Sequence, residues 1–126
     1  IDILIPKDRK EGIKVINALM ILSDKAAKEV DITWFDKDTD DSTIRVCDDV
    51  VVDLLFNACG HTYEELKKYA ETIEIDGMPV KTLDMEGLWL TKQTNRDKDI
   101  PDREFIKKAM EKYKSIVDNN KIQNEK

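Results

Sequence analysis

Apolar residues follow two patterns along the chain, short runs and helical stripes. Residues 3–5 form an apolar run that Pro6 closes, which is typical of a buried strand ending at a loop. Residues 43–47 alternate apolar and polar, and residues 50–56 are apolar except at one position, so both segments predict strands. Residues 72–83 contain Asp76-Gly77 between two segments that mix apolar and polar residues, which predicts a two-residue β-hairpin with a type I′ turn.

A start signal accompanies each segment with helical periodicity. The side-chain oxygens of Asp and Thr can accept hydrogen bonds from the first backbone N–H groups of a helix, and proline suits the first helical turn. The predicted helices are residues 9–22 after Asp8, Thr62 to about Glu71 with a capping box at Thr62 and Glu65, residues 85–94 after Asp84, and a last helix opened by Pro101. We expect the first helix to bury Ile13, Val15, Ile16, Leu19, Met20 and Leu22. The polar tail after Asp118 is predicted to fray.

Residues 24–42 give weaker signals. The pattern favours a helical turn at residues 26–29, a strand at residues 30–35 and an exposed acidic loop at residues 36–42. The order of elements is then strand, helix, strands, helix, hairpin and two helices. This order predicts an α+β fold with a mixed β-sheet flanked by helices. At 126 residues the chain fits a single domain, residues 1–126, and we expect it to be N-terminally incomplete because its first strand begins at once.

Charge and composition narrow the classes of function. The net charge of −6 disfavours nonspecific attraction to duplex DNA or to an anionic membrane. No apolar run reaches the roughly 18 residues of a membrane span, and the first residues lack the basic region of a signal peptide, so we expect a cytoplasmic protein. Two cysteines, Cys47 and Cys59, are too few for a disulfide framework.

Two carboxylates lie within strands that are otherwise apolar. Asp2 precedes residues 3–5, and Asp53 interrupts residues 50–56. Burying an unpaired charge is costly, so such a residue either pairs with a cation, binds a metal or lies at a strand end in contact with water. If the two strands are neighbours, Asp2 and Asp53 can share a divalent cation. Mg²⁺ fits, because it binds few protein carboxylates and keeps positions for phosphate oxygens.

Other acidic and nucleophilic groups have simpler explanations. The spacing of Asp36, Asp38 and Asp40 imitates the start of an EF-hand, but the turn glycine and the final bidentate glutamate are absent, so we interpret this segment as a solvated loop. Cys59 and His61 are two positions apart, which allows a nucleophile and a base. A turn before a helix explains that spacing better.

A basic cluster follows the third predicted helix. It consists of Lys92, Arg96 and Lys98. One interpretation is an ordinary helix end, where cations are favoured by the helix dipole, and the other is a phosphate-binding cluster that faces the carboxylates. Asp99 and Asp102 serve equally well as helix caps or as salt-bridge partners of Lys92 and Arg96.

The order of these motifs resembles the DNA polymerase β-like nucleotidyltransferase superfamily, in particular its small bacterial branch with resistance-type and toxin–antitoxin-type members. The resemblance covers nearly all of the chain in order. The matching segments are residues 2–6, Val52-Asp53-Leu54-Leu55, residues 77–88, Lys92, and the Arg96-x-Lys98-Asp99-x-x-Asp102 pattern. In that family one strand carries two acids separated by an apolar residue, and a neighbouring strand supplies a third. Asp2 matches the second acid and Asp53 the third, whereas the first acid and the Gly-Ser segment would precede Ile1.

The resemblance implies a nucleotidyltransferase-like fold and a two-metal reaction. Members use two Mg²⁺ ions to bind a nucleoside triphosphate and to activate an acceptor hydroxyl for attack at the α-phosphorus. Asp2 and Asp53 would then be catalytic metal ligands, and Asp53 can also accept the hydroxyl proton. Lys92, Arg96 and Lys98 would contact the nucleotide phosphates.

Two classes of function remain. The first is an enzyme that moves a nucleoside monophosphate onto a small molecule, a protein or an RNA end. The second is a noncatalytic or regulatory copy of the fold that binds a nucleotide or a partner protein, for example as one component of a toxin–antitoxin pair.

Overall fold

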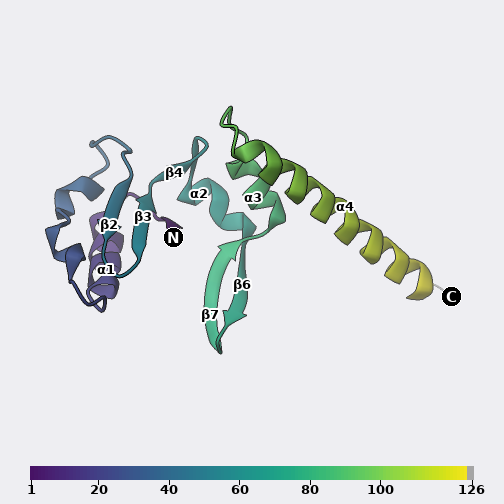
Figure 1. The fold of residues 1–126 in the computed structure, drawn as a ribbon, viewed down its shortest axis with the longest axis horizontal. Helices are drawn as coiled ribbons and strands as arrows, with labels where there is room; N and C mark the ends of the chain where they lie inside the picture. Colours follow the sequence, from purple (N-terminus) through teal and green to yellow (C-terminus); the bar gives the residue numbers. More distant parts are fainter. Residues whose placement is uncertain (125–126) are drawn as a thin grey trace. The chain divides into compact units, whose positions relative to one another are not determined.

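The computed structural model describes residues 1–124, with side chains through residue 119. The chain forms two compact units, Ile1–Glu65 and Leu66–Lys126. Both contain helices and strands (Figure 1), which confirms the predicted α+β class. The nucleotidyltransferase-like fold and the single domain stay predictions.

The first unit is built around a three-stranded sheet. Strand β1 (Asp2–Leu4) lies parallel to β3 (Val51–Leu55), and β2 (Ile44–Cys47) pairs antiparallel with the other edge of β3, so the order is β1-β3-β2. The predicted mixed sheet is therefore present, and all three strands lie where the apolar pattern places them. A short hairpin of β4 (Asn57–Ala58) and β5 (His61–Thr62) follows, with Cys59 and Gly60 at its turn.

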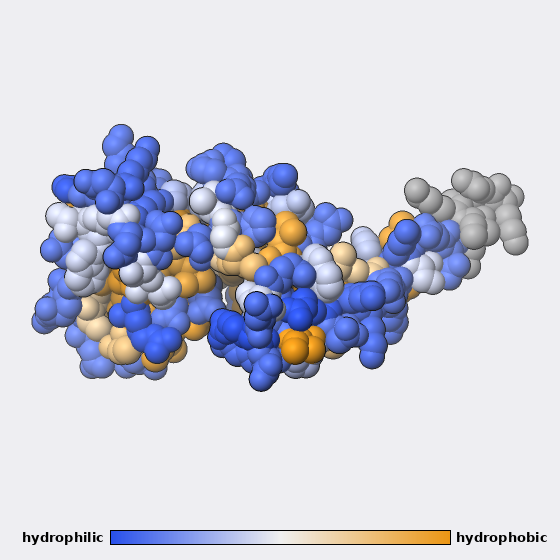
Figure 2. Space-filling view, turned by 90° about the horizontal axis from the view of Figure 1, so that it is seen from above, coloured by the Kyte–Doolittle hydropathy of each residue, from blue (hydrophilic) through white to orange (hydrophobic). Residues whose placement is uncertain are grey.

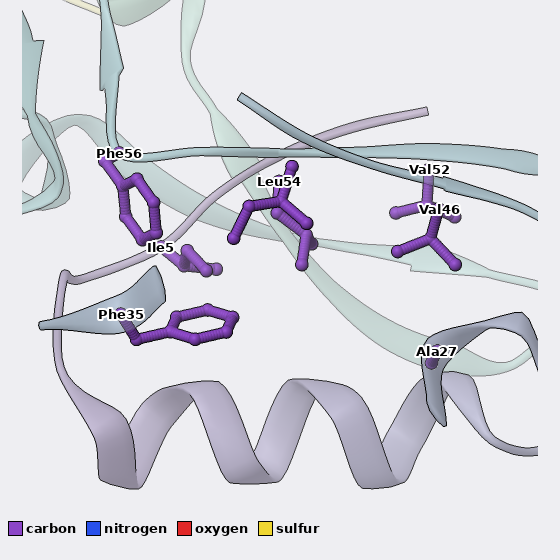
Figure 3. Close-up of a cluster of buried hydrophobic side chains, with 8 residues drawn as sticks. Ile5, Ala27, Phe35, Val46, Val52, Leu54 and Phe56 are labelled. Atoms are coloured by element: carbon purple, nitrogen blue, oxygen red, sulfur yellow. The ribbon is translucent and has the colours of Figure 1, made fainter. Parts of the chain in front are cut away.

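One face of this sheet carries the hydrophobic core. Alternate strand residues point to it, and helix α1 (Arg9–Leu19) and two short 3-10 helices cover them (Figure 3). The core consists of Ile5, Ala27, Phe35, Ile44, Val46, Val52, Leu54 and Phe56. Because β-strand side chains alternate, the residues between these core positions belong to the opposite face of the sheet.

Helix α1 begins where Asp8 predicts, because the Asp8 side chain accepts a hydrogen bond from the Lys10 backbone N–H at 2.7 Å. It ends at Leu19 rather than at residue 22. The predicted apolar face is wrong at Ile13, which is exposed. Gly12 is buried instead, and a Cβ at that position would lie 2.6 Å from the Phe35 ring. Gly12 thus lets an aromatic ring lie directly against the helix.

The segment before the sheet differs from its prediction. The helical turn is present as η1 (Ala26–Glu29), but the predicted strand at residues 30–35 is wrong. Residues Ile32–Phe35 instead form the 3-10 helix η2, which Asp31 caps by accepting a hydrogen bond from the Thr33 N–H at 2.9 Å. This turn brings Phe35 into the core, where it lies 5.6 Å from Phe56, centroid to centroid. Burial of one aromatic ring therefore outweighs the local strand propensity.

The second predicted helix is shorter than its pattern indicates. Helix α2 (Tyr63–Leu66) begins after the Thr62 cap and continues only as η3 (Lys67–Tyr69). Strand β6 (Ala70–Ile75) then begins, so the predicted extension to Glu71 is wrong.

The second unit contains the predicted hairpin and two helices. Strand β6 pairs with β7 (Met78–Leu83), and both turn residues have positive φ, 51° at Asp76 and 79° at Gly77, as a type I′ turn requires. Helix α3 (Met85–Thr91) is capped by Asp84, which accepts a hydrogen bond from the Gly87 N–H at 2.8 Å.

Helix α4 (Asp99–Asn124) contains Pro101 in its first turn and packs against α3. Its backbone is helical past Asp118, to Asn124, the last two residues lie outside the described part, and the fraying stays a prediction. Within residues 1–124, none of the helices combines the length and the apolar character that crossing a membrane would require. Hydrophilic side chains dominate the visible surface (Figure 2).

Candidate functional site

Strand register brings the two predicted carboxylates together. Asp2 and Asp53 are direct partners in the parallel β1–β3 pair, and the Asp53 N–H donates a hydrogen bond to the Ile1 carbonyl at 2.8 Å. Neighbouring strands lie about 4.8 Å apart. Ile3, Val52 and Leu54 point into the core, so both carboxylates belong to the opposite face. The expectation that Asp2 and Asp53 come from adjoining strands is confirmed.

Arg45 completes this group, and the sequence analysis did not single it out. It lies opposite Asp53 in the antiparallel β2–β3 pair. Its guanidinium donates two hydrogen bonds to the Asp53 carboxylate, Nε to Oδ1 at 2.8 Å and Nη2 to Oδ2 at 3.1 Å. The Arg45 side chain is 66% exposed, whereas that of Asp53 is 17% exposed. The alternation of apolar and polar residues at 43–47 could have predicted this placement, because it puts Arg45 on the face opposite the buried Ile44 and Val46.

The electrostatics of this group keep Asp53 ionised. The hydrogen bonds from Arg45 hold the pKa of Asp53 below its usual range, partial burial opposes them, and the Asp2 side chain adds a smaller lowering effect. The pKa of Arg45 is raised, chiefly by its hydrogen bonds to Asp53, with a weak contribution from the Asp2 charge. Asp2 is therefore close enough to influence both partners.

The donor set suits a hard divalent cation. Two carboxylates are the number that Mg²⁺ takes when phosphate oxygens complete its coordination. The remaining residues of this sheet face are Leu4, Cys47, Val51 and Leu55, so the strands β1–β3 supply two acids and one cation. Because Arg45 donates one hydrogen bond to each oxygen of Asp53, a metal ion on Asp53 would bind next to a positive charge.

A hollow of about 560 Å³ lies next to Arg45. It is lined by Trp34, which is exposed, and by Thr39, Asp40, Ser42, Thr43, Ile44 and Arg45. An aromatic ring, hydroxyl-bearing side chains and a guanidinium are the groups with which proteins stack on bases and bind phosphates. The hollow thus offers groups that can stack on a base and bind a phosphate, while Asp40 adds a negative charge to its lining.

The predicted phosphate-binding residues belong to the second unit. The Lys92 ammonium lies 3.2 Å from Asp102 Oδ2 and 3.8 Å from Asp99 Oδ1, so both acids are its salt-bridge partners, as one interpretation of the sequence proposed. Arg96 and Lys98 are exposed.

Asp99 organises the loop that carries this basic cluster. It is buried, and a hydrogen bond from the Thr94 hydroxyl is the chief reason that its pKa lies below the usual range, against the opposing effect of burial. Arg103 Nη1 donates to the Lys92 and Thr94 carbonyls at 2.8 and 2.7 Å. Lys92 is thus part of a loop-fixing network.

A second acidic group, which the sequence analysis missed, consists of Asp24, Asp48 and Asp49. Their oxygens lie within 4.8 Å of one another, so they could hold a metal ion. Asp48 also accepts hydrogen bonds from the backbone N–H groups of Asp24, Ala26 and Asp49 at 3.0, 2.9 and 2.8 Å. The Ala26 N–H is the main cause of the lowered pKa of Asp48. Asp48 thus fixes the turn before η1.

Two of the loop acids and His61 have partners within the first unit. Asp36 is paired with Arg9, and Asp40 accepts a hydrogen bond from the Ser42 N–H at 2.9 Å. His61 Nδ1 lies 3.2 Å from Glu65 Oε2, four residues along the chain.

Comparison with protein-family models, with curated proteins and with solved structures finds no match to this chain. The resemblance to nucleotidyltransferases therefore depends on the motif residues alone. What the protein does must be argued from the geometry of its carboxylates and of the groups around them.

Proposed function

We propose that the protein is a nucleotidyltransferase that moves a nucleoside monophosphate from a nucleoside triphosphate to an acceptor hydroxyl, with Asp2 and Asp53 as ligands of Mg²⁺. The observation that carries this proposal is the register of Asp2 with Asp53 on neighbouring parallel strands, on the face away from the core. A sheet gains no stability from two like charges in register. A cation bound by both carboxylates would explain why the two charges lie in register.

The state of Asp53 supports the role of metal ligand. Its lowered pKa keeps it ionised at neutral pH, and an ionised carboxylate is the form that binds a cation. The same shift makes Asp53 a weaker base while Arg45 is bound, so the ligand role is better supported than proton abstraction. When bound, Mg²⁺ would neutralise phosphate charge and polarise the reacting oxygens.

The phosphates have two candidate sets of cationic contacts. Arg45, which is bonded to Asp53, and the hollow that it lines with Trp34 lie in the first unit. The second set, in the second unit, consists of Lys92, Arg96 and Lys98, which stay predicted phosphate contacts. Since Lys92 already pairs with two acids, the exposed Arg96 and Lys98 are the better candidates within that cluster.

One observation favours the noncatalytic alternative, a copy of the fold that binds a nucleotide or partner protein. Arg45 neutralises Asp53 through a two-pronged ion pair, and strands β1–β3 contribute only two acids to this face. A two-metal reaction requires more negative ligands than these. The alternative predicts nucleotide binding without transfer.

Transfer of label from α-³²P-labelled nucleoside triphosphates to the acceptors in a cell extract tests the proposal. Asp2→Asn and Asp53→Asn should each lower magnesium-dependent labelling by at least roughly 100-fold, because losing even an outer partner of a metal ligand costs 10- to 100-fold. Asp38→Asn, in the exposed acidic loop, is the matched control and should label as the unchanged protein does. Equal labelling by Asp53→Asn and Asp38→Asn would refute the proposal, and nucleotide binding without any labelling would favour the alternative.

A further inference from the structure

We propose that Arg45 competes with the divalent cation for Asp53 and thereby sets the metal affinity of the site. This inference rests on the proposed function, because it concerns the same two carboxylates. Arg45 would be a positioning residue: it holds Asp53 in place while the site is without metal, and it withdraws when a metal ion and its phosphate ligands arrive.

The Arg45 guanidinium and a divalent metal ion would bind the same carboxylate. Both oxygens of Asp53 accept hydrogen bonds from the Arg45 fork, at 2.8 and 3.1 Å. A cation that binds Asp53 through either oxygen must approach the guanidinium within a few ångströms, where like charges repel. The two cations therefore weaken each other's binding to the same carboxylate.

Arg45 is placed so that it can leave. Its side chain is 66% exposed, and water and salt screen an ion pair of this kind strongly. The hollow that Arg45 lines with Trp34 provides space next to its present position. A guanidinium released from Asp53 can bind a phosphate in the same two-pronged manner. Breaking the Arg45–Asp53 pair therefore costs little free energy, and binding of Arg45 to a nucleotide phosphate can compensate for that cost.

Fold stability does not explain the pair well. Arg45 and Asp53 belong to β2 and β3, which are already joined by backbone pairing at four positions, from Ile44 with Leu54 to Cys47 with Val51. The ion pair therefore joins no element that is otherwise unconnected. A simple cross-strand pair would also leave Asp2 unexplained, since Asp2 lies in register on the far side of Asp53.

The chain offers a matched control. Arg9 donates two hydrogen bonds to Asp36, again through Nε and Nη2, and its side chain is 53% exposed. That pair joins α1 to the loop after η2, away from the sheet face of Asp2. Arg9→Gln and Arg45→Gln each remove one positive charge and one Arg–Asp fork, so they change the net charge equally.

Magnesium titration of ¹⁵N-labelled protein, followed by the amide shifts of residues 51–55, tests the inference. Arg45→Gln should bind Mg²⁺ about two- to five-fold more tightly than the unchanged protein, the range that the loss of one exposed competing ion pair allows. Arg9→Gln should bind as the unchanged protein does.

The outcomes separate this inference from the proposed function. If the unchanged protein binds Mg²⁺ at residues 51–55 and Arg45→Gln binds no more tightly, Arg45 is no competitor, and the proposed function stands. An equal gain in Arg9→Gln would show a general effect of net charge and would also overturn the inference. If Mg²⁺ shifts none of these amides in either protein, the metal site itself fails, and both proposals fail with it.

Discussion

Two acidic groups of the first unit differ in what their oxygens contact. Asp48, in the group with Asp24 and Asp49, accepts three backbone N–H hydrogen bonds, and those bonds shape the turn before η1. Asp53 accepts hydrogen bonds from Arg45, whose side chain is 66% exposed. A carboxylate that accepts hydrogen bonds from the backbone stabilises the fold, whereas one that pairs with an exposed side chain can exchange that partner. This contrast is our reason for proposing Asp2 and Asp53 as the functional pair, although the other group has more carboxylates.

The largest expected difference between the two groups is in activity. Asp53→Asn should reduce magnesium-dependent transfer by at least roughly 100-fold, and Asp48→Asn should leave the transfer rate of the folded protein nearly unchanged, because even outer partners of metal ligands contribute 10- to 100-fold. Rates measured on protein shown to be folded by circular dichroism check this contrast. A comparable loss in both variants would remove the distinction.

Two adjacent residues of strand β3 should differ in their effect on stability, because Leu54 belongs to the core and Asp53 to the opposite face. Leu54 is fully buried, so Leu54→Ala should lower the free energy of unfolding by about 2–5 kcal/mol. Asp53→Asn, on the other face, should leave the urea midpoint close to that of the unchanged protein. Urea unfolding of both variants at neutral pH measures the difference. A large loss of stability in Asp53→Asn would give Asp53 a structural role instead.

Acid unfolding should distinguish the two kinds of hydrogen bond. The pKa of Asp48 is lowered chiefly by the Ala26 N–H, and that of Asp53 chiefly by Arg45. A lowered folded-state pKa stabilises the protein above the unfolded value of about 3.9, and this contribution is lost as the pH falls toward the folded value. Both Asp→Asn variants should therefore lose less stability between neutral pH and pH 3 than the unchanged protein.

High salt should then separate these two variants. Salt screens the exposed Arg45–Asp53 pair, so the effect of Asp53→Asn should disappear in about 1 M KCl, where the screening length is about 3 Å. The effect of Asp48→Asn should persist, because backbone hydrogen bonds are short and local. Urea midpoints at pH 7 and pH 3 in low and high salt provide the measurement. Identical salt responses would contradict the contrast.

Much of the fold follows from local signals in the sequence. The strands of the sheet, the Asp76-Gly77 turn and the caps at Asp8 and Asp84 are where the pattern places them, because each depends on residues a few positions apart. The strand predicted at residues 30–35 fails for the opposite reason. A tertiary contact, the Phe35 ring against Gly12, decides the conformation there, and no local pattern encodes it.

The candidate site shows the same division. The apolar runs around Asp2 and Asp53 predicted two strands, whereas only the resemblance implied that these strands adjoin, which the register confirms. Arg45 and the Asp48 turn were missed, because each becomes meaningful only through its partner: Arg45 through the β2–β3 register, and Asp48 through the fold of residues 24–26. The roles of Lys92, Arg96 and Lys98 as phosphate contacts stay predictions.

Locating a bound paramagnetic ion tests the central claim most directly. Mn²⁺, added to ¹⁵N-labelled protein as a substitute for Mg²⁺, broadens the amide signals of residues close to it. The account predicts that the signals of Asp2 and of residues 52–54 broaden first, at the lowest Mn²⁺ concentrations. Early broadening at Asp24, Asp48 and Asp49, with residues 52–54 unaffected, would contradict it.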